Sequence, residues 1–95
     1  MFLDGKQNVA VITGSSSGIG FETALMLGRN GFLTYATMRD LGKRDAIRSV
    51  ADKENLLLRV VQLDVTKDDS VKSAVDSITA EAGRIDVLVN NGVMD

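Results

Sequence analysis

The chain has 95 residues, 44% of them hydrophobic and 25% charged, with a net charge of −2 and neither cysteine nor histidine. Its length fits one small domain spanning residues 1–95, and the missing residue types exclude disulfides, a thiol nucleophile, a Ser-His-Asp triad and the usual zinc ligand sets. The net charge of −2 argues against nucleic acid as a partner. Without a signal-peptide pattern or an apolar run of about 20 residues, we expect a cytoplasmic protein with no membrane partner.

The first half of the chain alternates segments of strand and helix character. Val9–Thr13 is short, continuous and rich in β-branched residues, as in a strand that is buried on both faces. The stretch Gly18–Arg29 has helical spacing of its apolar residues, and Phe32–Met38 follows as a second strand. A second helix is expected over about Lys43–Asp52, with Asp40 as its N-terminal cap.

The second half continues the alternation. Leu56–Leu63 is the expected third strand, and Thr66 is the expected cap of a third helix. That helix has its apolar stripe between Val71 and Ala82, and Ile85–Val89 follows as the fourth strand. Strand–helix alternation implies right-handed βαβ crossovers, so we predict an α/β fold with a Rossmann-type doubly wound parallel sheet of order 3-2-1-4.

The turn between the first strand and the first helix is the most informative stretch. Its glycines have separate uses: Gly14 permits a sharp turn, Gly18 lets the backbone approach a pyrophosphate, and Gly20 permits close packing of helix on sheet. The serines add hydroxyl donors, and the helix N-terminus favours negative charge. No lysine follows, which disfavours a triphosphate cradle. The predicted phosphate-binding residues are Gly14, Ser15, Ser16, Ser17, Gly18, Ile19 and Gly20. The alternative is a glycine-rich turn that holds no ligand.

The residues after the second strand indicate which dinucleotide is bound. Met38 and Arg39 are expected at the end of that strand, about twenty residues beyond the glycine turn, where a dinucleotide fold meets the adenosine ribose. An acidic residue would bind the 2′-hydroxyl of NAD, whereas an arginine pairs with the 2′-phosphate of NADP. NADP is therefore favoured over NAD. Two alternatives stay open: Asp40 reaches the ribose after a small shift, or Arg39 is solvated and paired with Asp40.

In its form TGSSSGIG, the turn closely resembles the cofactor motif of the short-chain dehydrogenases/reductases. Two later segments resemble the same family in the same order, an LDV segment containing Asp64 and Val65 and a DVLVNNG segment that begins at Asp86. The resemblance implies that Asp64 and Val65 hold the adenine ring. A local alternative is that Asp64 only caps the turn into the third helix.

The DVLVNNG segment departs from the family's D-x-L-V-N-N-A-G pattern, because no alanine follows Asn91. One deleted residue, with Gly92 in the role of the glycine, is the economical explanation, and two substitutions are the alternative. The resemblance implies that Asn90 stabilises the sheet and that the backbone of Asn90, Asn91 and Gly92 lies beside the cofactor ribose.

The resemblance also implies an activity. Members of this family transfer a hydride between NADP(H) or NAD(H) and a carbonyl or alcohol, using a serine and a Tyr-x-x-x-Lys pair. The only tyrosine here is Tyr35, inside the second strand and followed four residues later by Arg39, so we expect Tyr35 in the core and no catalytic residue. The chain is thus predicted to be the truncated, N-terminal, cofactor-binding part of a short-chain oxidoreductase, inactive alone. A small-molecule substrate is expected only in a complete enzyme.

Two other functions stay open at this stage. The chain could be a non-catalytic module that senses or sequesters a dinucleotide, with the edge of its fourth strand covered by self-association. A methyltransferase-like fold also begins with a glycine-rich turn. The absence of an acid at Met38 and Arg39 argues against it, because such folds hold the ribose hydroxyls with a carboxylate there.

Overall fold

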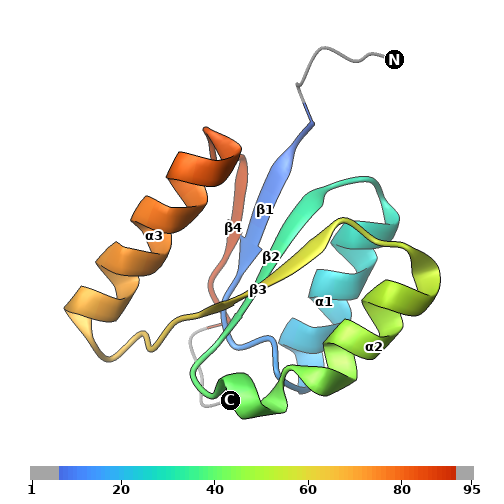
Figure 1. Cartoon of the computed structure of the whole chain (residues 1–95), viewed down its shortest axis with the longest axis horizontal. Helices are drawn as coiled ribbons and strands as arrows, with labels where there is room; N and C mark the ends of the chain where they lie inside the picture. The colour runs from blue at the N-terminus through green and yellow to red at the C-terminus, as the bar shows by residue number, and fades with distance from the viewer. Residues whose placement is uncertain (1–6, 92–95) are drawn as a thin grey trace.

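The computed structural model describes residues 7–91, which form one parallel four-stranded sheet with helices on both faces (Figure 1). The strands lie in the order β3-β2-β1-β4, and every neighbouring pair is parallel. In chain order the elements are β1 (Val9–Ile12), α1 (Gly18–Arg29), β2 (Leu33–Met38), η1 (Leu41–Lys43), α2 (Asp45–Glu54), β3 (Leu58–Gln62), α3 (Asp68–Ala82) and β4 (Val87–Val89). The predicted fold class and strand order are confirmed.

Alternate residues of each strand face opposite layers of the molecule. On one face Ala10, Ile12 and Met38 pack with Leu25 of α1 and Ile47 of α2 in the larger buried cluster. On the other face α3 stands alone over the sheet (Figure 1), where Ile78 packs against Val9, Val11 and Tyr35. The continuous burial of β1 follows from having helices on both sides, as its run of apolar residues predicts.

Both predicted caps are wrong, because each side chain bonds within the segment that precedes its helix. The Asp40 carboxylate accepts the N–H of Gly42 at 2.8 Å and so caps η1, a turn that precedes α2. The Thr66 hydroxyl donates to Asp64 Oδ1 at 2.6 Å, and α3 starts after Lys67 without a side-chain cap. The third strand is also shorter than predicted, since the N–H of Leu56 still bonds to the end of α2.

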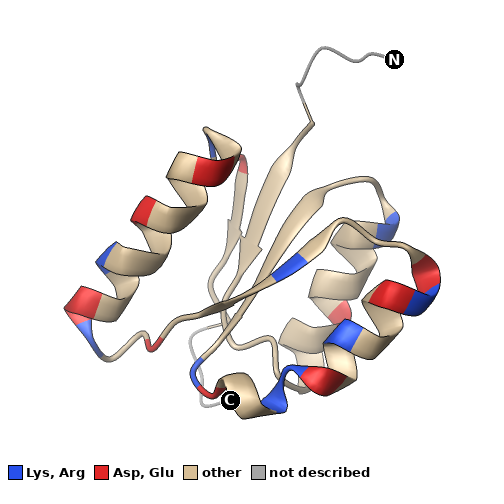
Figure 2. Cartoon of the chain, viewed as in Figure 1, with Lys and Arg blue, Asp and Glu red and all other residues tan. Residues whose placement is uncertain are grey.

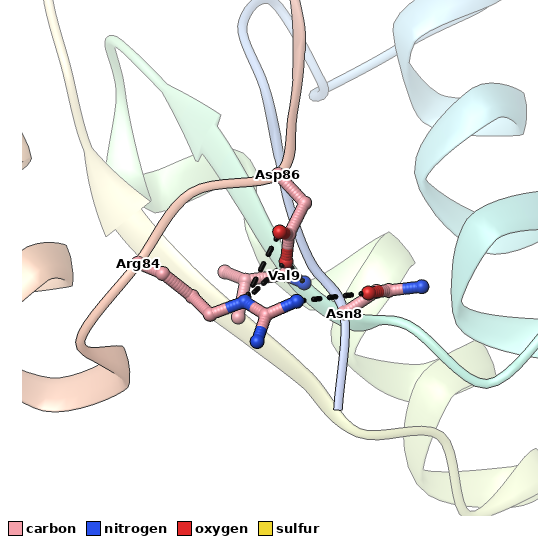
Figure 3. Close-up of polar contacts among 4 residues, drawn as sticks. All are labelled: Asn8, Val9, Arg84 and Asp86. Atoms are coloured by element: carbon pink, nitrogen blue, oxygen red, sulfur yellow. Dashed lines mark hydrogen bonds and ion pairs between the residues drawn. The ribbon is translucent and has the colours of Figure 1, made fainter. Parts of the chain in front are cut away.

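Polar contacts fasten the start of β4 to β1 (Figure 3). Asp86 Oδ2 accepts the N–H of Val9 at 2.7 Å, and the N–H of Asp86 donates to the Val9 carbonyl at 2.9 Å. Arg84 Nε donates to both oxygens of Asp86, and its Nη2 donates to Asn8 Oδ1 at 3.1 Å. These contacts occupy Asp86, so β4 begins at Val87 rather than at the predicted Ile85.

Charged residues lie mostly on the helices and in the connections. Figure 2 shows basic and acidic segments interspersed along α2, and mainly acidic segments along α3. Within the sheet, Arg59 of β3 pairs with Glu81 of α3 at 3.1 Å. Across residues 7–91, no helix combines the length and apolar character that crossing a bilayer requires.

Candidate functional site

The glycine turn follows β1 at the side of the sheet where the carboxyl ends of the parallel strands lie. Gly14 and Gly18 have φ values of 63° and 64°, a backbone region that favours glycine. A Cβ at position 20 would lie only 2.1 Å from the carbonyl oxygen of Gly14. Gly20 is therefore needed for the first turn of α1 to lie against the Gly14 backbone, a closer contact than the helix–sheet packing predicted for it.

The segment after β4 lies directly against this turn. The N–H of Thr13 donates to the Val89 carbonyl at 3.0 Å, and its hydroxyl donates to Asn90 Oδ1 at 3.2 Å. The same hydroxyl accepts the N–H of Asn91 at 2.9 Å, while Asn91 Nδ2 donates to the Gly14 carbonyl at 3.3 Å. Thr13 was not predicted as a site residue, although it opens the TGSSSGIG motif. Gly92 lies outside the described residues.

The three serines of the turn have different environments, which corrects the prediction that all supply hydroxyls to a phosphate. Ser15 is fully buried, its hydroxyl donates to the Ile12 carbonyl at 2.9 Å, and its N–H donates to the Thr37 carbonyl at 3.0 Å. Both of its donors are thus used inside the protein. Ser16 Oγ is buried without a hydrogen-bond partner, and Ser17 is exposed at the start of α1.

The end of β2 presents one of the two predicted residues. Met38 is the last residue of β2, as in the predicted range Phe32–Met38, and its side chain is fully buried in the core. Its side chain therefore does not reach a ligand at the surface, which leaves only its backbone for the predicted cofactor contact. Arg39 is exposed, and its carbonyl accepts Gln62 Nε2 at 3.1 Å. Figure 2 shows further basic segments around η1, close to this strand end.

The Asp64 carboxylate holds the turn that leads to α3. Its Oδ1 accepts both the hydroxyl of Thr66, at 2.6 Å, and the N–H of Thr66, at 3.0 Å. These two bonds lower the pKa of Asp64, and the positive charges of Lys67 and Arg39 add to the effect. The structure thus bears out the capping alternative for Asp64, while a contact with adenine stays a prediction. Val65 beside it is 47% exposed.

Tyr35 is a core residue, as predicted. It is almost completely buried between the sheet and α3, and its phenol donates to Glu81 Oε1 at 2.5 Å. Burial, followed by the hydrogen bond to Glu81, raises the pKa of Tyr35 to about 12. Tyr35 therefore packs on the α3 face of the sheet, with Val9, Val11 and Ile78.

A phosphate group fits the turn on two observations. The buried Ser16 hydroxyl has no protein partner, and a Cβ at Gly18 would meet no atom within 4 Å, so the backbone there faces open space. The first turn of α1 also carries neither a side-chain cap nor an acidic residue, which leaves its N–H groups and dipole available to an anion.

Comparison with known proteins agrees with this geometry. Retinol dehydrogenase 8 of Bos taurus is 44% identical over 85 residues, which are 85% of this chain and 27% of that protein. Menthone neomenthol reductase from Mentha piperita superimposes with a TM-score of 0.85 at 33% identity, covering 94% of this chain and 32% of that structure. A metagenomic short-chain oxidoreductase in complex with NADP gives a TM-score of 0.84 at 35% identity, covering 96% of this chain and 41% of that structure.

The chain spans about a third or less of the curated relatives it matches, 27% of the bovine protein and 32% of an uncharacterised oxidoreductase of Myxococcus xanthus. Within this chain the likeness is nearly complete, because the family pattern of the short chain dehydrogenases matches residues 8–95. The glycine turn, the sheet order and this match together place the chain in the short chain dehydrogenase family.

Proposed function

We propose that the chain binds NADP(H) and forms the cofactor-binding part of an oxidoreductase that transfers a hydride between this cofactor and a carbonyl or alcohol. The observation that carries the proposal is the meeting of the Gly14–Gly20 turn, the exposed Arg39 and the Asn90–Asn91 segment at one edge of the sheet. Ligands of open α/β sheets bind at this edge, outside the carboxyl ends of the strands. The NADP complex of a relative at 35% identity supports the choice of cofactor.

Different residues of the chain would bind different parts of the cofactor. The pyrophosphate would lie on the N–H groups from Ser16 to Gly20, with the Ser16 and Ser17 hydroxyls as further donors. Arg39 would pair with the 2′-phosphate, because a guanidinium binds phosphate through two parallel hydrogen bonds. Asp64 and Val65 would hold the adenine, and Asn90, Asn91 and Gly92 would lie beside the ribose. The bound nicotinamide would supply the hydride chemistry.

We further propose that these 95 residues alone are inactive. In the part of the chain that the structure describes, the tyrosine that is present, Tyr35, lies in the core, and its phenol donates a hydrogen bond to Glu81. The serines of the turn lie where phosphates would bind, away from a reacting carbonyl. We expect the protein in the cytoplasm, because its sequence has no signal-peptide pattern and no cysteine.

The cofactor assignment is tested by binding to the 95-residue chain. NADPH should raise its melting temperature more than NADH does, and Arg39→Ala should weaken NADPH binding by about 1.5–3 kcal/mol, the value of a hydrogen bond to a charged group, while barely changing NADH binding. Calorimetric titration with each cofactor measures both. Arg59→Ala is the matched control, because Arg59 pairs with Glu81 on the α3 side of the sheet.

The outcomes separate the competing assignments. Equal losses of NADPH and NADH binding in Arg39→Ala would remove Arg39 from the 2′-phosphate. A folded chain that binds neither cofactor would contradict the proposal, and a preference for S-adenosylmethionine would favour the methyltransferase-like alternative, against which family membership argues.

A second candidate function is a non-catalytic module that senses or sequesters the dinucleotide. The observation that favours it is the outer edge of β4, where Leu88 is 63% exposed in a strand with no neighbour on that side among the described residues. A second copy of the chain would cover this edge. This function requires a stable self-associated protein that binds cofactor without turnover.

A further inference from the structure

Three fully buried residues link the glycine turn to the end of β2. The carbonyl of Ile12, the last residue of β1, accepts two hydroxyl hydrogen bonds, one from Ser15 and one from Thr37, each at 2.9 Å. In return, the Thr37 carbonyl accepts the N–H of Ser15 at 3.0 Å. All three residues are 0% exposed, so these bonds form a closed ring shielded from water.

This ring lies between two parts of the proposed cofactor site. Ser15 belongs to the turn assigned to the pyrophosphate, and Thr37 is two residues before Arg39, which is assigned to the 2′-phosphate. Backbone pairing alone already aligns β1 with β2, with Ile12 opposite Ala36. The ring extends this alignment one residue further along β2, which stays paired with β3 as far as Met38, and ties β2 to the start of the glycine turn, where β1 has left the ladder.

We propose that Thr37 is a positioning residue for dinucleotide binding: its hydroxyl, through Ile12 and Ser15, sets the spacing between the pyrophosphate-binding turn and Arg39. The inference rests on the proposed function. A ligand that bridges two sites binds tightly only when the distance between the sites matches the distance between the ligand groups that they bind. Loosening the hydrogen-bond ring therefore lowers the affinity for the whole dinucleotide. A ligand without a pyrophosphate does not bridge the turn and Arg39, so its affinity does not depend on this spacing.

The test compares Thr37→Val, Thr37→Ser and Thr34→Val in the 95-residue chain. Thr34 is the matched control, because it is fully buried in the same strand and its hydroxyl donates to the Phe32 carbonyl at 3.1 Å, away from the turn. Each variant is titrated with NADPH and with adenosine 2′-monophosphate, which carries the 2′-phosphate but no pyrophosphate.

Thr37→Val should weaken NADPH binding about fivefold, as expected for one buried hydrogen bond, and change adenosine 2′-monophosphate binding less than about twofold. Thr37→Ser retains the hydroxyl and should restore NADPH binding, and Thr34→Val should bind both ligands like the unchanged protein. If Thr37→Val does not fold, Ser15→Ala removes the other hydroxyl of the ring and carries the same expectation.

Three results would overturn the inference: unchanged NADPH binding in folded Thr37→Val, equal weakening in Thr37→Val and Thr34→Val, or equal weakening of both ligands. Hydrogen exchange of the Ser15 amide in the ligand-free protein tests the ring separately, and Thr37→Val should speed it about fivefold. If the unchanged protein binds no dinucleotide, the proposed function fails, and unchanged exchange at Ser15 would then reject the ring as well.

Discussion

A single absent Cβ allows α1 to begin against the carbonyl of Gly14. At Gly20 an added methyl group would lie 2.1 Å from that oxygen, and 3.1 Å from Asn91 Nδ2. Both neighbours belong to the site: one is backbone of the glycine turn, and the other is the side chain that bonds the turn to the segment after β4. A substitution here therefore moves the turn, because a backbone carbonyl cannot swing aside as a long side chain can.

We expect Gly20→Ala to destabilise the chain by about 1–3 kcal/mol, as for other overpacked positions, and to abolish the rise in melting temperature produced by NADPH. Gly28→Ala is the control in the same helix. A Cβ there would meet only the flexible Leu56 side chain, at 3.3 Å, so its stability should change by no more than about 1 kcal/mol. Urea denaturation and thermal shift measure both variants. Equal behaviour of the two variants would show that contact with the Gly14 carbonyl does not govern the site.

At the scale of elements, β4 is the weakest part of the sheet. It has three residues and pairs only with β1 among the described strands. Asp86 compensates at its start, since the carboxylate accepts the Val9 N–H while the guanidinium of Arg84 lies 2.9 Å away (Figure 3). Those two contacts, with that of Arg84 the larger, lower the pKa of Asp86.

The pKa of the Asp86 carboxyl group is lower in the folded protein than in the unfolded chain, where it is near 3.8. Such a group stabilises the fold at pH values above its unfolded pKa. This stabilisation is lost as the pH falls through the lowered pKa of the folded state. We therefore expect Asp86→Asn to be less stable than the unchanged chain at neutral pH. The difference should shrink as the pH falls from about 5 to about 2, because the unchanged chain loses its carboxylate there.

Urea midpoints over a pH series measure this difference. Asp76→Asn is the control, because Asp76 forms only an exposed ion pair with Lys72 along α3, and such pairs contribute little. The carboxyl groups of Glu54 and Asp64, whose pKa values are also lowered, titrate in every variant and cancel in the comparison. A stability difference that stays constant over the whole series would mean that the Asp86 charge is not what fastens β4.

At the scale of the whole molecule, the two edges of the sheet differ. The β3 edge is protected, because Arg48 of α2 donates to the Leu58 carbonyl at 2.7 Å and Arg59 places a charge within the strand. Among the described residues, the β4 edge has neither a covering arginine from a helix nor a charge within the strand. Leu88 of β4 is exposed on the face of the sheet that α3 covers. Unprotected apolar edges pair with other strands, so contact between molecules is expected at β4.

We expect the 95-residue chain to self-associate through β4, and Leu88→Lys to make it monomeric. A lysine at an edge strand opposes pairing, because its charge would be desolvated in the contact. Met26→Lys is the control, since Met26 is similarly exposed but lies on α1, away from β4. Sedimentation velocity over a range of concentrations distinguishes the species. A chain that is monomeric at every concentration would contradict self-association and weaken the sensing-module function with it.

The elements that could be read from the sequence are those with strong local signals. The β-branched run of β1, the helical spacing of α1 and the glycine turn between them depend on residues close together in the chain, and the structure confirms their positions within one residue. The resemblance to the short-chain dehydrogenases rests on motifs of the same local kind, which is why it was sufficient for the family and the strand order.

The features that the sequence did not predict depend on contacts between segments. Ser15 looked like its two neighbouring serines, but its burial against the Ile12 and Thr37 carbonyls became visible only when β2 lay beside β1. Met38 was expected to bind the cofactor, but the packing of α2 on the sheet buries its side chain in the core. The caps failed for a related reason, since Asp40 and Thr66 each had several N–H groups or oxygens within reach.

By itself the sequence determined the α/β class, the order of the strands and the presence of a dinucleotide-type turn, because periodicity and glycine spacing act over a few residues. Only the tertiary structure decided which side chains of that turn face outward, that Thr13 joins it to Asn90 and Asn91, and that Thr37 connects it to β2. The physical reason is that a hydroxyl or amide bonds to whichever partner folding brings within about 3 Å, and such partners can lie far apart along the chain, 25 residues for Thr37 and Ile12 and 77 residues for Thr13 and Asn90.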